Sequence, residues 1–226
     1  MLLEYGYVTR TGEIMHIPDS FMPITQGAVY WIIALIFIAL ALRWVKNELS
    51  EEKVPLVAVL AAGVFALQAF NLPVTMGTSG HLVGGALVAI VLGSPFAAIF
   101  VLSLVLIVQG VLFGDGGITV MGANIINMGV IGGFVGYYGY HGLLSVTRNI
   151  YASAACAAWL ACIIPALAAS VELALAGTFP LVPGMISMGI YHAVIGLIEG
   201  GITAVVLGLI SSARPDILES AGGIPA

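Results

Sequence analysis

Charged side chains are scarce in this sequence of 226 residues: Asp, Glu, Lys and Arg together make up 8 % of it, against about 25 % in a soluble domain. Hydrophobic residues make up 61 %, above the roughly 45–50 % of a soluble domain. A water-soluble fold would have to expose much of this apolar surface. The composition therefore excludes a soluble enzyme and a disordered chain, and it predicts an integral membrane protein.

Basic residues are fewer than acidic ones, six Lys and Arg against eleven Asp and Glu, which gives a net charge of −5. A nucleic-acid-binding surface needs a basic patch, so this balance excludes that class of protein. The two cysteines, Cys156 and Cys162, both lie inside one apolar run. They indicate neither a disulfide framework nor a thiolate metal site.

Three motifs of catalysis or nucleotide binding are missing from the chain. It contains no Gly-x-x-x-x-Gly-Lys-Ser/Thr loop, no His-Glu-x-x-His and no Gly-x-Ser-x-Gly. The sequence therefore indicates no nucleotide hydrolysis, no zinc protease and no serine hydrolase. We do not expect an enzyme, and the energy for any transport would have to come from another protein.

Seven apolar segments dominate the chain, and most of them approach the length of about 20 residues that a membrane-spanning helix needs. The third is short and flanked by glycines. The connections are brief, so we expect no separate soluble domain. The predicted spans are residues 28–45, 54–70, 82–92, 97–113, 125–146, 151–176 and 185–210.

The basic residues give the orientation of these spans, because Lys and Arg accumulate on the cytoplasmic side of a membrane. With seven spans, all but one of them fall on the same side, which places the N-terminus outside and the C-terminus in the cytoplasm. The exception is Arg10. The residues on the cytoplasmic side are Arg43, Lys46, Lys53, Arg148 and Arg214.

Polar chemistry gathers on the side predicted to face outward. His16, His81, Asp115 and Asn124 lie there in segments rich in Gly, Pro and Ser, which suggests that a small polar ligand is captured from outside. If Ser79 caps the third span, His81 lies in the first helical turn, where the helix dipole disfavours a charged imidazole. Metal binding needs the neutral ring, so His81 is a candidate metal ligand.

Two ionisable residues lie in the last span, and one of them, His192, is near its outer end. His192 and Glu199 are seven residues apart and therefore share one helix face. Intramembrane ionisable groups pair with polar partners inside the bundle, and we expect a polar clamp with Gln68 or Gln109. Glu172 lies near the outer end of its helix, where we expect it to face water.

Small residues recur at four-residue spacing on two helices, which lets helix backbones approach closely in a membrane. Either stripe could pack inside the bundle or dock a partner membrane subunit. The first stripe is Ala58, Ala62 and Ala66, and the second is Gly196, Gly200, Ala204 and Gly208.

Several motifs together resemble those of the CbiM/NikM family, the substrate-binding membrane subunits of energy-coupling-factor cobalt and nickel importers. The first of them reads Met-His-Ile-Pro-Asp-Ser-Phe-Met, and the likeness extends in order to about residue 212. The motifs lie at residues 15–22, 65–71, 77–82, 112–117, 122–124 and 192–200.

This resemblance implies an all-α membrane protein in which one extra N-terminal helix precedes a core of six helices. It also implies the metal ligands: the free amine of Met15, the amide nitrogen and imidazole of His16, and the imidazole of His81. Four nitrogens in a plane suit Ni²⁺, or Co²⁺ held in the same geometry. Residues expected around this site are Asn71, Thr78, Ser79, Asp115 and Asn124.

Residues 1–14 stand before the methionine that should carry the free amine. Attached, they would leave Met15 with an amide and remove one donor. We therefore expect an upstream extension at 1–14 that is absent from the working chain, and a single transmembrane metal-binding domain at 15–226.

The family likeness implies a protein of the cell membrane that captures Co²⁺ for import, to supply cobalamin synthesis. Import of Ni²⁺ by the same mechanism is the alternative. It implies a coupling transmembrane subunit, separate ATP-binding subunits and a small accessory membrane subunit as partners, and no resident cofactor. Ala58, Ala62 and Ala66 are the expected docking stripe. Two remoter alternatives are a membrane metalloenzyme built on His81, His192 and Glu199, and an importer subunit for a vitamin.

Overall fold

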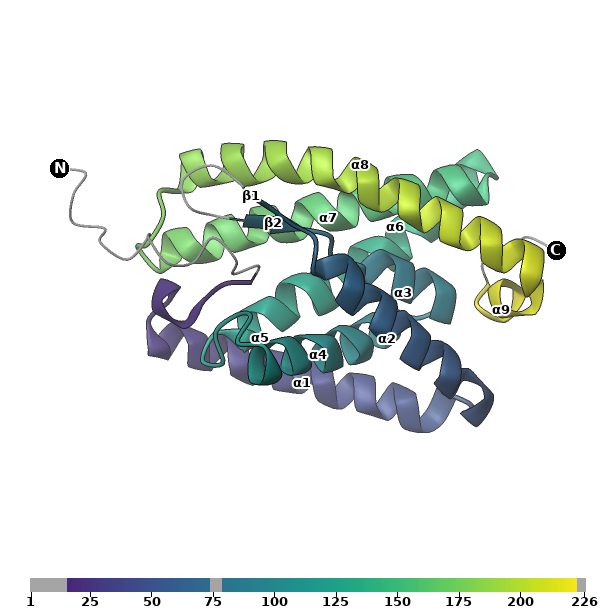
Figure 1. The fold of residues 1–226 in the computed structure, drawn as a ribbon, viewed down its shortest axis with the longest axis horizontal. Coiled ribbons are helices and arrows are strands. Elements are labelled where there is room, and N and C mark those ends of the chain that lie inside the picture. Colours follow the sequence, from purple (N-terminus) through teal and green to yellow (C-terminus); the bar gives the residue numbers. More distant parts are fainter. Residues whose placement is uncertain (1–15, 74–78, 223–226) are drawn as a thin grey trace.

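Helices account for nearly all of the computed structural model, which describes residues 16–73 and 79–222 (Figure 1). A π-helical segment, Ile125–Ile131, joins α5 to α6 without a break. The helices are α1 (Ile24–Glu48), α2 (Val54–Gln68), α3 (Gly85–Leu92), α4 (Pro95–Leu112), α5 (Met121–Asn124), α6 (Gly132–Thr147), α7 (Ile150–Leu175), α8 (Leu181–Ala213) and α9 (Pro215–Ser220).

Each of the seven predicted segments contains a helix, so the helical class is confirmed. Four of these helices, α1, α4, α7 and α8, are long and apolar enough to cross a membrane. Their outward faces carry large apolar side chains such as Ile32, Ile36, Leu197 and Val205, as a surface in contact with lipid requires.

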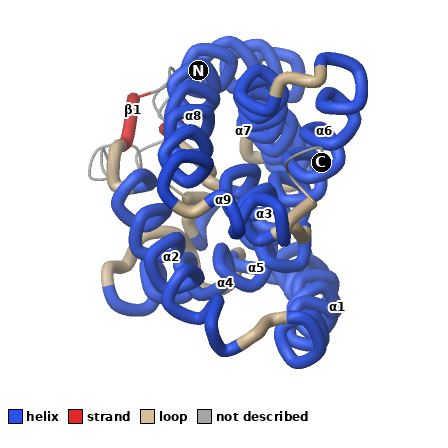
Figure 2. The backbone as a smooth tube through the Cα atoms, turned by 90° about the vertical axis from the view of Figure 1, so that its right-hand side faces the viewer, coloured by secondary structure: helices blue, strands red, loops and turns tan. Residues whose placement is uncertain are grey.

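Helix α3 is the core of the bundle. All eight of its residues are buried, and it contacts α4, α6, α7 and α8; the end-on view places it among these helices (Figure 2). Eight residues rise only about 12 Å, so α3 by itself is shorter than the roughly 30 Å of a bilayer core.

The chain enters α3 through a two-stranded hairpin, which was not predicted. Strand β1 (Asn71–Pro73) pairs antiparallel with β2 (Ser79–His81). Gly84 caps the helix in a left-handed conformation with φ 78°, which glycine adopts without strain. The expectation that Ser79 caps this helix is therefore wrong, and His81 lies in a strand ahead of it.

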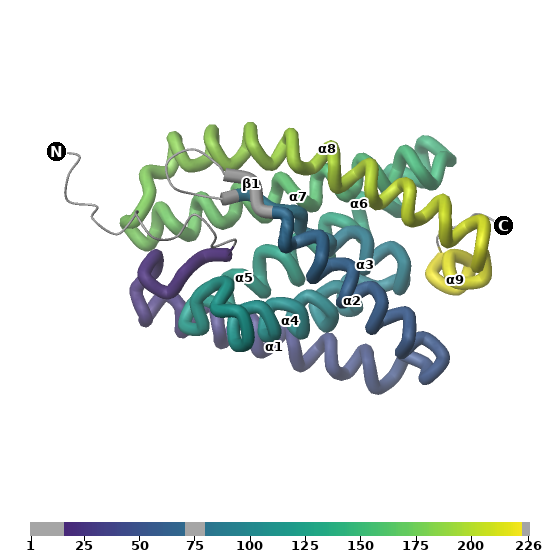
Figure 3. The backbone as a smooth tube through the Cα atoms, in the orientation of Figure 1, coloured from purple at the N-terminus to yellow at the C-terminus, as the bar shows by residue number. Residues whose placement is uncertain are grey.

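The connections between helices gather at two ends of the molecule (Figure 3). At one end, Lys46 lies in the last turn of α1, Lys53 precedes α2, Arg148 ends α6 and Arg214 ends α8. The hairpin, the α4–α5 loop and the α7–α8 connection lie toward the opposite end. The basic residues that gave the predicted orientation thus share one end of the fold.

The two small-residue stripes differ in where they face. A Cβ atom at Gly200 would lie 2.6 Å from the backbone oxygen of Ala155 on α7, and one at Gly196 would lie 3.0 Å from Trp159. This stripe therefore packs inside the bundle. The stripe of Ala58, Ala62 and Ala66 is exposed along α2.

Candidate metal site

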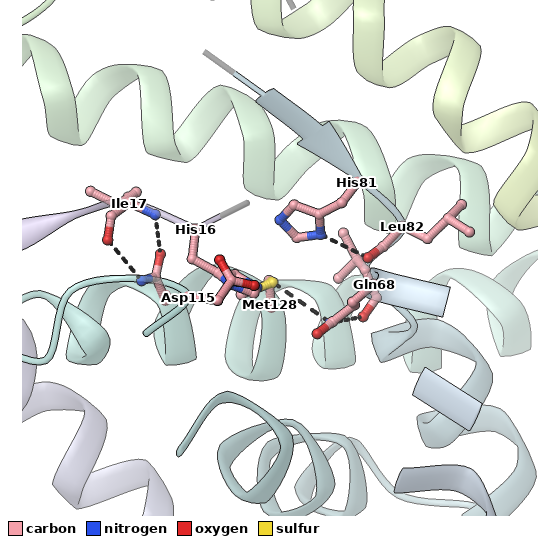
Figure 4. A network of polar contacts seen from close by, with 9 residues as sticks. His16, Ile17, Gln68, His81, Leu82, Asp115 and Met128 are labelled. Atoms are coloured by element: carbon pink, nitrogen blue, oxygen red, sulfur yellow. Dashed lines mark hydrogen bonds and ion pairs between the residues drawn. The ribbon is translucent and has the colours of Figure 1, made fainter. Parts of the chain in front are cut away.

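Two histidines that are 65 positions apart in the chain meet inside the bundle. The ring centroids of His16, which precedes α1, and His81, which ends β2, lie 4.7 Å apart at an interplanar angle of 62°. Both residues are buried, with exposed fractions of 5 % and 8 %. Figure 4 shows His16 near His81, which lies at the end of strand β2. The structure thus brings together the two predicted imidazole ligands.

The ring of His81 is held in one tautomer. Its Nδ1 lies 2.8 Å from the carbonyl oxygen of Leu82, an acceptor only, so Nδ1 carries the proton and Nε2 keeps its lone pair. Burial, reinforced by the nearby His16, lowers the pKa of His81 to about 3. The ring is therefore neutral at physiological pH, the form in which histidine binds metals.

The ring of His16 lies in a polar corner made by the α4–α5 loop. Its Nδ1 is 3.3 Å from Oδ2 of Asp115, and neither ring nitrogen has a hydrogen-bond partner within residues 16–73 and 79–222. A buried nitrogen without a hydrogen-bond partner raises the free energy of the folded state. A bound ion would remove this penalty by accepting the lone pair of the imidazole. The Asp115 carboxylate adds negative charge that favours a cation beside it.

Hydrogen bonds fasten the segment around His16 to α5 and to the same loop. The N–H of Ile17 donates to Oδ1 of Asn124 at 3.2 Å, and Asn124 Nδ2 donates back to the Ile17 carbonyl at 3.3 Å. Farther along, Asp19 Oδ1 accepts both the N–H and the hydroxyl of Thr119 at 2.7 Å. Asp115 and Asn124 therefore lie beside His16, whereas the anchoring role of Thr119 was missed because a threonine in a loop carries no signal of its own.

A cavity of about 70 Å³ lies between these groups and α7 and α8. Pockets for drug-sized organic ligands occupy about 300–1,000 Å³, so this cavity is nearer in size to an ion with a few waters than to an organic ligand such as a vitamin. Its polar lining consists of His16, His81, Asn124, Asn127 and His192.

Asn127 on the π-helical segment also faces this cavity and was not predicted. Its Nδ2 donates to Oε2 of Glu172 at 2.7 Å, while its Oδ1 is buried with no hydrogen-bond partner among the described residues. The expectation that Glu172 faces water is wrong, because only 7 % of this residue is exposed. Its side chain lies on the face of α7 that packs against the π-helical segment, where it meets Asn127. Segments of π-helix often mark functional sites.

The expected clamp of His192 and Glu199 with Gln68 or Gln109 is wrong for the described residues: Glu199 and Gln68 bind backbone groups, and Gln109 Oε1 is buried without a hydrogen-bond partner there. Glu199 accepts the N–H groups of Val83 at 2.8 Å and Gly84 at 2.9 Å, and Gln68 Nε2 donates to the Val83 carbonyl at 2.8 Å. His192 Nδ1 lies 2.8 Å from the Met188 carbonyl one turn earlier. Glu199 and Gln68 thus hold the peptide groups that follow His81.

Four of the predicted site residues have no described side chain. Met15 and Thr78 fall outside the described residues, and of Asn71 and Ser79 only the backbone is described, paired in the hairpin. Within the described part of the chain, no three His, Cys, Asp or Glu side chains come close enough to hold a metal ion. His16 and His81 therefore need further donors to complete a metal site.

A bundle of apolar helices that encloses two neighbouring imidazoles at an ion-sized cavity defines a membrane protein suited to bind a metal ion. Comparison with known proteins agrees with this class. The chain belongs to the CbiM family, the cobalt uptake substrate-specific transmembrane region, whose model matches residues 16–217.

Similar proteins and a similar solved structure are also metal transporters. The chain is 37 % identical over 207 residues to a candidate fused nickel transport protein NikMN of Archaeoglobus fulgidus, covering 91 % of this chain and 68 % of that one. It is 34 % identical over 182 residues to the cobalt transport protein CbiM of Clostridium tetani, covering 80 % and 73 %. A crystal structure of a transition metal transporter matches with a TM-score of 0.84 at 32 % identity, covering 91 % of this chain and 97 % of that one. The protein is thus a transmembrane metal transport protein and not an enzyme.

Proposed function

We propose that this protein is the substrate-capture subunit of an ATP-driven energy-coupling-factor importer, with Co²⁺ as its cargo and Ni²⁺ as the alternative. The observation that carries the proposal is the pair His16 and His81, whose rings lie 4.7 Å apart at one buried, ion-sized cavity. The family, whose model is described by cobalt uptake, supports the choice of metal.

The proposed ligand set adds the N-terminus to the two imidazoles. A free amine on Met15, the amide nitrogen of His16 and its Nδ1 would close two adjacent chelate rings, since only Nδ1 lies near enough to its own amide. His81 Nε2 would be the fourth nitrogen. Such a planar set suits Ni²⁺ or Co²⁺, and Asp115, 3.3 Å from Nδ1, would offset the charge. This arrangement requires a working chain that begins at Met15.

We further propose seven membrane spans in the cell membrane, with α5, the π-helical segment and α6 acting as one span. The end that carries Lys46, Lys53, Arg148 and Arg214 would be cytoplasmic, by the positive-inside rule. The cavity then opens toward the outside, where the cargo is. The partners would be a coupling transmembrane subunit, ATP-binding subunits and a small accessory membrane subunit.

Metal binding by purified protein tests the proposal. A chain beginning at Met15 is stripped of metal and dialysed to equilibrium against Co²⁺ and Ni²⁺, separately and in competition. We expect one ion per chain in the wild type and loss of high-affinity binding in His16→Ala and in His81→Ala. The competition identifies the preferred cargo.

His141→Ala is the matched control, because His141 lies on α6 and its Nδ1 is 2.9 Å from the Tyr137 carbonyl of the same helix. It should bind as the wild type does. Unchanged stoichiometry in His81→Ala would refute the proposed site.

A further inference from the structure

One peptide group connects a predicted metal ligand to a buried carboxylate on another helix. The carbonyl of Leu82 accepts Nδ1–H of His81 at 2.8 Å. The N–H of the same peptide, contributed by Val83, donates to Oε2 of Glu199 at 2.8 Å. A peptide group is planar and rigid, so the orientation of this carbonyl depends on what holds its N–H.

Glu199 is well placed to hold that N–H. It is only 3 % exposed, and its second oxygen accepts the N–H of Gly84 at 2.9 Å. The Cys162 side chain on α7 lies next to this carboxylate. Bonds from N–H groups to a carboxylate are about twice as strong as those between neutral groups. The carboxylate is therefore fixed between α8, α7 and the entrance to α3.

We propose that Glu199 is a positioning residue for the metal ligand His81 and acts on it through the Leu82–Val83 peptide. This inference rests on the proposed metal site. Metal-binding histidines donate their second ring N–H to a carboxylate or carbonyl, which fixes the ring and makes the ligating nitrogen more basic. Here the carbonyl is backed by a carboxylate, and successive hydrogen bonds polarise and strengthen one another.

A second side chain, Gln68, makes it possible to distinguish positioning of His81 from general stiffening of the junction between β2 and α3. From α2, its Nε2 donates to the carbonyl of Val83 at 2.8 Å, which belongs to the next peptide and does not touch His81. Both side chains brace the junction between β2 and α3, but of the two it is Glu199 that binds the peptide whose carbonyl accepts from the imidazole. Removing Gln68 should therefore affect metal binding less than removing the Glu199 carboxylate.

The experiment compares three variants of the chain beginning at Met15. Glu199→Gln keeps the shape of the side chain but replaces one acceptor oxygen with an NH₂ donor that cannot accept a backbone N–H. Gln68→Met removes the second brace with little change of volume. Thr203→Val is the control, since Thr203 is equally buried, 1 % exposed, one turn farther along α8. Each is measured for Co²⁺ and Ni²⁺ affinity and for the visible absorption bands of the bound ion.

We expect Glu199→Gln to weaken binding by roughly 10- to 100-fold, the usual effect of losing a partner of a metal ligand, and to shift the absorption bands. Gln68→Met should have a smaller effect on affinity and leave the bands in place, and Thr203→Val should change neither. If Glu199→Gln does not purify as a folded protein, Glu199→Asp takes its place, because it keeps the charge but cannot reach both N–H groups.

The possible results are distinct. A wild-type chain that binds neither ion overturns the proposed function and this inference with it. A wild-type chain that binds, together with a folded Glu199 variant of unchanged affinity and spectrum, overturns this inference alone. Equal losses and equal spectra in the Gln68 and Glu199 variants also overturn it, because stiffening of the junction then explains both.

Discussion

Asn124 binds Ile17 through both ends of its side-chain amide, accepting the backbone N–H at 3.2 Å and donating to the carbonyl at 3.3 Å. The Asn124 side-chain amide thereby pairs with the Ile17 backbone much as a neighbouring strand would. Because Ile17 directly follows His16, this pairing holds the His16 imidazole at the cavity and couples the first described residues of the chain to α5.

Replacing Asn124 with Leu should weaken metal binding about tenfold or more. The change removes two hydrogen bonds of about 0.5–1.5 kcal/mol each, and tenfold corresponds to about 1.4 kcal/mol. Asn47→Leu, at an exposed position near the end of α1, is the control and should bind normally. Equilibrium dialysis of both variants measures the effect; equal affinity would show that Asn124 does not hold His16.

We expect metal binding to require glycine at position 116, because there is no room for a side chain there. A Cβ atom there would lie 2.7 Å from Cβ of His16, and the residue has φ 88°. Gly114 also has a positive φ, of 67°, but nothing lies within 4 Å of its Cβ position. Both Ala variants incur the cost of a left-handed residue, about 1–2 kcal/mol, but only Gly116→Ala displaces the imidazole.

We therefore expect Gly116→Ala to lose at least about tenfold more metal affinity than Gly114→Ala, because ligands must be held within about 0.5 Å of their working positions. Thermal unfolding of the two variants should be shifted similarly. Similar affinities for the two variants would mean that the loop does not press on His16.

The start of the chain should control metal affinity. A protein that begins at Met15 can offer a free amine, whereas one that retains residues 1–14 offers an amide at the same place. We expect the longer form to bind Co²⁺ or Ni²⁺ roughly a hundredfold more weakly or worse, since even loss of a partner of a ligand costs about 10- to 100-fold. Intact mass of both preparations confirms their N-termini before dialysis, and tight binding by the longer form would exclude the amine as a ligand.

The exposed stripe on α2 should serve assembly and not metal binding. Ala62→Leu is expected to leave metal affinity unchanged but to weaken co-purification with the coupling membrane subunit, because a bulky side chain keeps helices apart. Ala39→Leu, at an exposed position on α1, is the control. Retained assembly with lost metal binding would contradict a docking role for Ala62.

Apolar runs and turn residues determined which parts of this chain are helical, because both signals are local. Predicted segments at 97–113 and 151–176 differ from α4 and α7 by at most two residues at either end. The start of α3 was missed for two reasons. The hairpin before it depends on pairing between two segments, and the helix is capped by the left-handed backbone of Gly84 and not by a side-chain hydroxyl.

Composition and motif order by themselves determined the membrane class, the family and His16 and His81 as candidate ligands. The tertiary structure alone decided that the two rings meet, that Glu172 is buried against Asn127, and that Gly200 faces α7 while Ala62 faces outward. In a membrane protein the helix faces toward lipid and toward neighbouring helices are both apolar, so hydropathy cannot tell them apart. Which residues meet is set by packing between distant segments, and that information is not local to any stretch of the chain.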